Sequence, residues 1–209
     1  KALTLDQVQQ NYGAGAVRYG RATAASKTVI GTQGVSVTSP SISATLGTGI
    51  KTISVSPVIL GITTDTSTAN TVILTSANSL AATDTQTSRT YTETLTATDA
   101  AGASTSYRLS YLVNPPIIET ATTTTITTTS GIESSTVIYA TQGSGDKNFT
   151  LTGDAPAGVA LVGGANQTTL RVLSTINPGT YWETVTASDV NGATSSLAIK
   201  VIVNPGPTI

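Results

Sequence analysis

The chain contains one segment twice. Residues 91–116 read YTETLTATDAAGASTSYRLSYLVNPP, and residues 181–206 read YWETVTASDVNGATSSLAIKVIVNPG, with 12 of 26 positions identical and no gap. A second pair, residues 44–55 and 140–151, matches at an offset of 96 instead of 90, so the first copy carries six extra residues. Tandem copies of a small β-rich unit typically build length, reach or a lattice, and they seldom build a single active site.

The composition excludes several classes of partner. Charged residues make up 10% of the 209-residue chain, the formal net charge is −1, and the ten Lys and Arg residues are scattered. Nucleic-acid binding needs a clustered basic footprint, so we expect no nucleic-acid partner. No apolar run is long enough to cross a bilayer, so we expect no membrane insertion.

Three residue types that carry chemistry are missing altogether. The chain has no Cys, no Met and no His. Without Cys and His, the usual nucleophile–base triads and zinc sites cannot be assembled, so we expect a non-catalytic protein with no metal and no cofactor. The absence of readily oxidised side chains suits an extracellular or cell-surface location.

The repeat divides the chain into an N-terminal extension and two domains. Residues 1–28 lie outside the repeat, and the capping-box pattern of Thr4 to Gln7 makes a short helix a candidate there. Residues 29–116 and 117–209 form the two copies. In the second copy, short runs with turn signals predict strands near 134–141, 146–152, 158–162, 168–174, 180–190 and 193–203. We therefore expect an all-β chain of two tandem antiparallel β-sandwiches after a short extension.

A longer pattern accompanies these strands. Each copy contains Tyr-x-x-Thr-[Leu/Val]-Thr-Ala-[Thr/Ser]-Asp-x-x-Gly-Ala and then an alternating strand that ends in Val-Asn-Pro; residues 155–159 read APAGV. This pattern resembles the bacterial immunoglobulin-like (cadherin-like, putative-Ig) repeats of large surface proteins, over roughly residues 30–205. The resemblance implies an immunoglobulin-like sandwich. Its implication for function is broader, because such modules serve as stalks, adhesins, lattice subunits and enzyme spacers.

Strand alternation places charged residues among apolar ones in both copies. Glu93 and Glu183 share a strand face with apolar neighbours, and so do Lys51 and Lys147. An unpaired buried charge is costly, so we expect each Lys to meet the Glu of its own copy. Such a pair would pin the register of two strands.

A covalent crosslink is the alternative interpretation of these residues. In an intramolecular isopeptide bond, a buried neutral Lys amine attacks an Asn or Asp side chain while a protonated Glu polarises the carbonyl. The candidate Asn residues are Asn114 and Asn204 at the strand ends, or else Asn70 and Asn166 in a shared Ala-Asn turn.

Weaker candidates surround these residues. Asp99 and Asp189 could be calcium ligands, although Asp is also a favoured first residue of a tight turn. The Thr-rich tract 122–130 could carry sugars or form a strand at a sheet edge, and Asn148 and Asn166 each open a glycosylation triplet.

The function indicated by these features is structural. We expect a subunit of a cell-surface or extracellular assembly, whether a filament or pilus, a surface layer or an adhesin stalk. Its N-terminal arm and its Thr-rich edges would make the contacts with identical subunits, by strand addition to an exposed sheet edge. The alternative is a carbohydrate- or receptor-binding module of an adhesin or phage appendage. Aromatic residues form only 4% of the chain, which supports a sugar-binding surface poorly.

Overall fold

The computed structural model describes residues 26–154 and 157–209, and the helix expected near the N-terminus lies outside them. All regular structure in the described residues is β-strand, and no helix there could cross a membrane. The chain forms two compact units. Unit 1 comprises the described residues up to Gly31 together with Ser36–Leu80 and Ser88–Val113. Unit 2 comprises Thr32–Val35, Ala81–Thr87 and Asn114–Ile209. The domain limits inferred from the repeat stay predictions.

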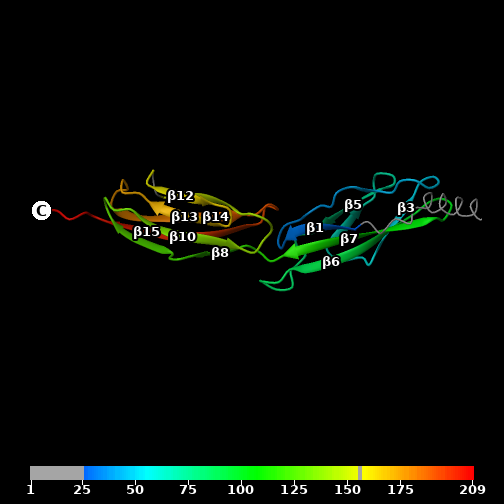
Figure 1. Cartoon of the computed structure of the whole chain (residues 1–209), viewed down its shortest axis with the longest axis horizontal. Helices are drawn as coiled ribbons and strands as arrows, with labels where there is room; N and C mark the ends of the chain where they lie inside the picture. Colours follow the sequence, from blue (N-terminus) through cyan, green and yellow to red (C-terminus); the bar gives the residue numbers. More distant parts are fainter. Residues whose placement is uncertain (1–25, 155–156) are drawn as a thin grey trace, which may run out of the picture. The chain divides into compact units, whose positions relative to one another are not determined.

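Unit 1 is a sandwich of two sheets (Figure 1). One sheet has the order β1-β7-β6-β3, and the other has the order β2-β5-β4. The strands are β1 (Ser26–Thr32, whose last residue belongs to unit 2), β2 (Ile42–Ser43), β3 (Thr52–Ser56), β4 (Ile62–Asp65), β5 (Thr71–Ser76), β6 (Arg89–Thr98) and β7 (Ser104–Asn114).

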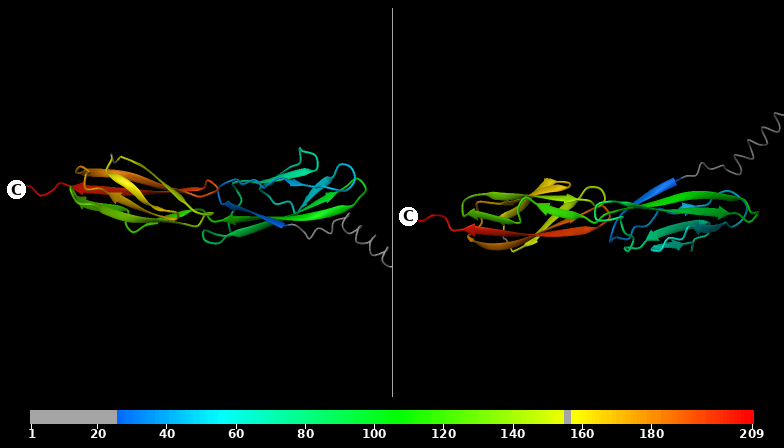
Figure 2. Two further views of the ribbon diagram at one scale, coloured as in Figure 1. Left: turned by 45° about the horizontal axis from the view of Figure 1, so that its top comes forward. Right: turned by 90° about the horizontal axis from the view of Figure 1, so that it is seen from below.

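Unit 2 repeats this arrangement with one more strand, β8, at the edge of its second sheet. Its sheets have the orders β11-β14-β15-β9 and β12-β13-β10-β8. The strands are β8 (Ile118–Ala121), β9 (Thr125–Thr129), β10 (Ser134–Thr141), β11 (Asn148–Gly153), β12 (Val159–Gly164), β13 (Gln167–Val172), β14 (Gly179–Ser188) and β15 (Thr194–Asn204). The hairpin of β14 and β15 pairs ten residues from each strand and is the longest ladder of the unit (orange to red in Figure 2). The chain is therefore an all-β protein of two tandem immunoglobulin-like sandwiches, as the sequence predicts.

The strands predicted for the second copy agree with the observed ones to within two residues at each end. The Thr-rich tract also forms a strand, β9, which lies at the edge of its sheet and pairs in parallel with β15. Its alternation explains why: Ile126 and Thr128 point inward, whereas Thr125 and Thr127 are exposed. Branched side chains at every position also favour the extended backbone of a strand.

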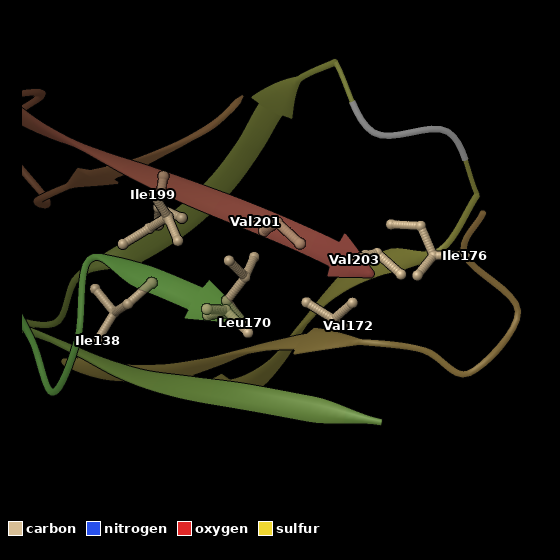
Figure 3. Packing of buried hydrophobic residues seen from close by; sticks show 9 residues of the cluster. Ile138, Leu170, Val172, Ile176, Ile199, Val201 and Val203 are labelled. Atoms are coloured by element: carbon tan, nitrogen blue, oxygen red, sulfur yellow. The ribbon is translucent and has the colours of Figure 1, made fainter. Parts of the chain in front are cut away.

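The core of each unit comes from alternate residues of both sheets. In unit 2, Ile138, Leu170 and Val172 of one sheet face Ile199, Val201 and Val203 of the other, and Ile176 closes one end (Figure 3). In unit 1, fully buried Val72 and Leu74 of β5 pack with Leu109 and Tyr111 of β7. Each such aliphatic side chain contributes about 1.5–3 kcal/mol on burial, so the packing of alternate residues fixes which face of each strand is internal.

Candidate functional site

An aspartate turn is the polar feature that both units share. In unit 1, Asp99 begins the turn between β6 and β7, and its Oδ1 accepts hydrogen bonds from the backbone N–H groups of Ala101 and Ala103, both at 2.9 Å. Its Oδ2 accepts from the N–H of Thr48 at 2.8 Å, in the glycine-rich loop before β3. These hydrogen bonds, with that of Thr48 the strongest, lower the pKa of Asp99, and the charge of Lys51 adds to the effect.

Unit 2 repeats the same geometry around Asp189. Oδ1 of Asp189 accepts from the N–H groups of Asn191 at 2.9 Å and Ala193 at 3.0 Å, and Oδ2 accepts from the N–H of Ser144 at 2.9 Å. Burial by itself raises the pKa of this carboxyl, but the hydrogen bonds outweigh burial and the pKa is lowered. Each Asp thus closes its own turn and also holds a second loop.

The Asp turn needs a glycine at its fourth position. Gly102 and Gly192 have φ angles of 87° and 85°, in the left-handed region that glycine adopts without steric cost. No group of three candidate metal ligands occurs in residues 26–154 and 157–209. The hydrogen bonds make both carboxylates turn residues, and calcium binding by Asp99 and Asp189 stays a prediction.

Unit 2 adds a hydroxyl chain to its Asp turn. Thr32 Oγ1 donates to Asp189 Oδ2, and the same Oγ1 lies 2.7 Å from Ser144 Oγ. Asn114 Nδ2 donates to Ser144 Oγ at 3.0 Å. Because a hydroxyl has one proton to donate, the consistent direction runs from Asn114 through Ser144 and Thr32 to Asp189. Asn114 therefore has a structural partner in unit 2.

The strand register separates each predicted Lys–Glu pair. In unit 1, Thr52 of β3 pairs with Thr98 of β6, which places Lys51 level with Asp99 and six residues along β6 from Glu93. Six residues of an extended strand span about 20 Å. The structure therefore does not bring Lys51 and Glu93 together.

The same separation occurs in unit 2. Asn148 of β11 pairs with Ser188 of β14, so Lys147 is level with Asp189, whereas Glu183 pairs with Gly153. Lys147 is only 6% exposed, and its Nζ donates to the carbonyl of Gly145 at 2.6 Å.

The Lys51 amine of unit 1 makes the corresponding contact with the carbonyl of Gly49, at 2.7 Å. Both amines therefore bind the backbone of their own loop, two residues before the Lys. The expected strand-pinning ion pair does not form, because alternation selects the face of a strand and leaves the position along it open.

The two glutamates are buried, as the alternation predicts. Glu93 and Glu183 are each 2% exposed. Oε1 of Glu93 accepts from the backbone N–H of Ile59 at 3.2 Å, while Oε2 has no hydrogen-bond partner among the described residues. Burial raises the pKa of this carboxyl.

Glu183 occupies space that a glycine leaves open. A Cβ built on Gly153, its cross-strand partner, would lie 2.4 Å from Oε2 of Glu183 and 2.5 Å from the carbonyl oxygen of Trp182. This fit could not be predicted from the sequence, because Gly153 resembles an ordinary end-of-strand glycine until its cross-strand partner is known.

The remaining candidate Asn residues, Asn70, Asn166 and Asn204, have structural roles in turns and at a strand end. Asn70 and Asn166 have φ angles of 61° and 67°, a left-handed conformation that Asn tolerates better than most residues in turns. Asn70 Oδ1 accepts from the backbone N–H of Lys51 at 2.7 Å, and Asn166 Nδ2 donates to Asp146 at 3.0 Å. Asn204 is exposed, and its backbone carbonyl accepts from Ser130. None of these contacts joins a Lys amine to an Asn side chain.

The comparisons with known proteins concern fold alone. No family model matches the chain, and no curated protein matches it. Among solved structures, a chimeric titin Z1Z2 functionalized with a peptide from decorin is 16% identical, with 86% of this chain and 93% of that chain covered and a TM-score of 0.39. The I-band fragment I67–I69 of titin is 15% identical, with 86% and 62% covered and a TM-score of 0.43. The extracellular cadherin domains 1–4 of protocadherin gamma B7 are 13% identical, with 87% and 49% covered and a TM-score of 0.39.

Proposed function

We infer that this chain is a non-catalytic structural subunit of a cell-surface or extracellular assembly, such as a filament, a surface layer or an adhesin stalk. The proposal rests on the hydrogen bonds made by the Asp and Lys residues that the two copies share. In both copies the Asp carboxylate and the Lys amine are directed to the backbone of the protein's own loops. The two copies therefore share hydrogen bonds that hold the loop conformation, and a defined loop conformation is what a tandem structural module needs.

Exposed sheet edges supply a means of association. β3 and β11 are edge strands of their sheets, and an edge strand offers unpaired backbone groups to a further strand. Residues 1–25, the part of the predicted arm that precedes β1, would make such a contact with a neighbouring subunit by strand addition. The lack of Cys and Met supports an oxidising, extracellular setting.

Electron microscopy of the intact protein and of a variant without residues 1–26 tests the proposal. Ordered filaments or sheets that are lost on deletion are the expected result, because the arm would supply the added strand. Monodisperse particles from both proteins at every concentration would contradict self-assembly. That outcome would favour a stalk or a binding module instead.

A further inference from the structure

Two loops of the chain share one structure. The loops Thr32–Val35 and Thr129–Ile132 both read Thr-x-Gly-[Val/Ile], and their glycines, Gly34 and Gly131, have φ angles of 91° and 92°. The N–H of the fourth residue donates to the carbonyl of the Thr, at 3.1 Å in the first loop and 2.9 Å in the second. The second residue donates to an Asn carbonyl in both, Asn114 or Asn204. We refer to the pair as the Thr-x-Gly loops.

The first Thr-x-Gly loop covers the Asp turn of unit 2. Its Thr32 hydroxyl donates to Asp189, and Val35 packs against a small apolar cluster that includes Ala187 and Ala193. Both alanines are buried as a result, as is Asp189.

The equivalent Asp turn of unit 1 has no such cover in the described part of the chain. Asp99 makes the same backbone hydrogen bonds, yet within residues 26–154 and 157–209 no hydroxyl donates to it. Ala103, the counterpart of Ala193, is exposed. Leu46 and Ile50 of the adjacent loop are 72% and 75% exposed. Exposed aliphatic side chains next to an unfilled acceptor are typical of an interaction surface.

The second Thr-x-Gly loop has the complementary property. It has the backbone of the loop that fills the turn in unit 2, and its Ile132, the counterpart of Val35, is 61% exposed. The loop offers a hydroxyl donor and an aliphatic side chain, and the Asp99 turn offers a carboxylate acceptor and an aliphatic rim.

We propose that the Thr129–Ile132 loop of one copy of the chain docks on the Asp99 turn of a second copy. In this contact the Thr129 hydroxyl donates to Asp99 Oδ2, and Ile132 packs against Ala103 and Leu46. The loop and the turn are different surfaces, so the contact is heterologous, and a heterologous contact that does not close into a ring continues into a filament. This contact rests on the proposed function and adds a second contact between subunits to the strand addition by the N-terminal arm.

A chemical crosslink tests the contact, because the natural chain has no Cys that could interfere. The full chain carrying both Ile132→Cys and Ala103→Cys is treated with a short bismaleimide. A ladder of dimers, trimers and longer products on a denaturing gel is expected. Val162→Cys combined with Ala103→Cys is the matched control, since Val162 is also exposed, at 50%. An equal ladder from the control, or no ladder from the test pair, would overturn the contact.

A charge substitution supplies the independent readout. Ile132→Asp places a carboxylate against Asp99, so the oligomers expected for the unmodified protein in sedimentation velocity should disappear. Val162→Asp should leave these oligomers in place. Sedimentation and microscopy of the unmodified protein measure assembly itself. Filaments without a specific ladder would overturn this contact and leave the proposed function standing. A monomer at every concentration would overturn both this contact and assembly into a filament or a surface layer.

Discussion

Asp99 and Asp189 stand in the same turn of two related units, and their surroundings differ. Each carboxylate accepts two hydrogen bonds from its own turn and one from the loop before the edge strand of the same sheet, β3 or β11. Only Asp189 is buried, because Thr32 and Val35 cover it. The turn itself thus forms from local sequence. How much its carboxylate contributes to stability depends on the residues that pack over it.

Removal of the Asp carboxylates should give the largest difference in stability between the two units. We expect Asp189→Ala to lower the free energy of unfolding by about 2–4 kcal/mol, because it leaves the buried Ser144 N–H and Thr32 hydroxyl without their acceptor. Asp99→Ala should have a smaller effect, since water reaches the donors that it exposes. Urea denaturation followed by far-UV circular dichroism measures both. Equal losses would show that the cover on Asp189 adds no stability.

The second largest effect is expected at Gly153, the glycine that pairs with Glu183 in unit 2. Gly153→Ala should cost about 1–3 kcal/mol, because the new methyl group would overlap the Glu183 carboxylate and the strand backbone. Gly164→Ala is the matched control, since a Cβ there has no neighbour within 4 Å. Thermal denaturation of the two variants checks the expectation. A similar melting temperature for both would mean that β11 shifts to make room for the methyl group.

The buried carboxyl of unit 1 should make stability depend on pH. Burial raises the pKa of Glu93 in the folded state, so the folded protein holds a proton that the unfolded chain releases. Stability from this group is therefore fully present below the unfolded pKa and is lost as the pH rises through the folded pKa. Glu93→Gln should remove that part of the pH dependence. Urea titrations between pH 4 and pH 7 test this, and an unchanged slope would contradict it.

The smallest expected effect comes from making unit 2 resemble unit 1 on its surface. Trp182 is 53% exposed with Lys200 5.6 Å from its ring centroid, and Thr92 stands at the matching position of unit 1. Trp182→Thr should cost less than about 1 kcal/mol, the size of an exposed cation–π contact. Calorimetry measures it, and a larger loss would assign the ring a packing role.

Much of the fold could be read from the chain, and the reasons are local. Alternation in residues 134–141 and 193–203 predicted strands that the structure contains, because one apolar face per strand must be buried. The burial of Glu93 and Glu183 followed from the same rule. The turns at Asp99 and Asp189 followed from the preference of Asp and Gly for their positions.

The partners of the charged residues could not be read in this way. Lys51 and Glu93 share an inward parity, yet the register of β3 on β6 leaves them six residues apart. The fit of Gly153 to Glu183, and the capture of Asp189 by Thr32, likewise join residues far apart in the chain.

The sequence by itself therefore determined the repeat, the β-sandwich class, the inward face of each strand and the two Asp turns. These depend on short-range preferences and on a period of two residues. The tertiary structure was needed to show which hydrogen-bond donor meets which acceptor and which of the two Asp turns is covered. Strand register and loop packing depend on contacts among many side chains from distant parts of the chain, so they cannot be predicted from any short segment.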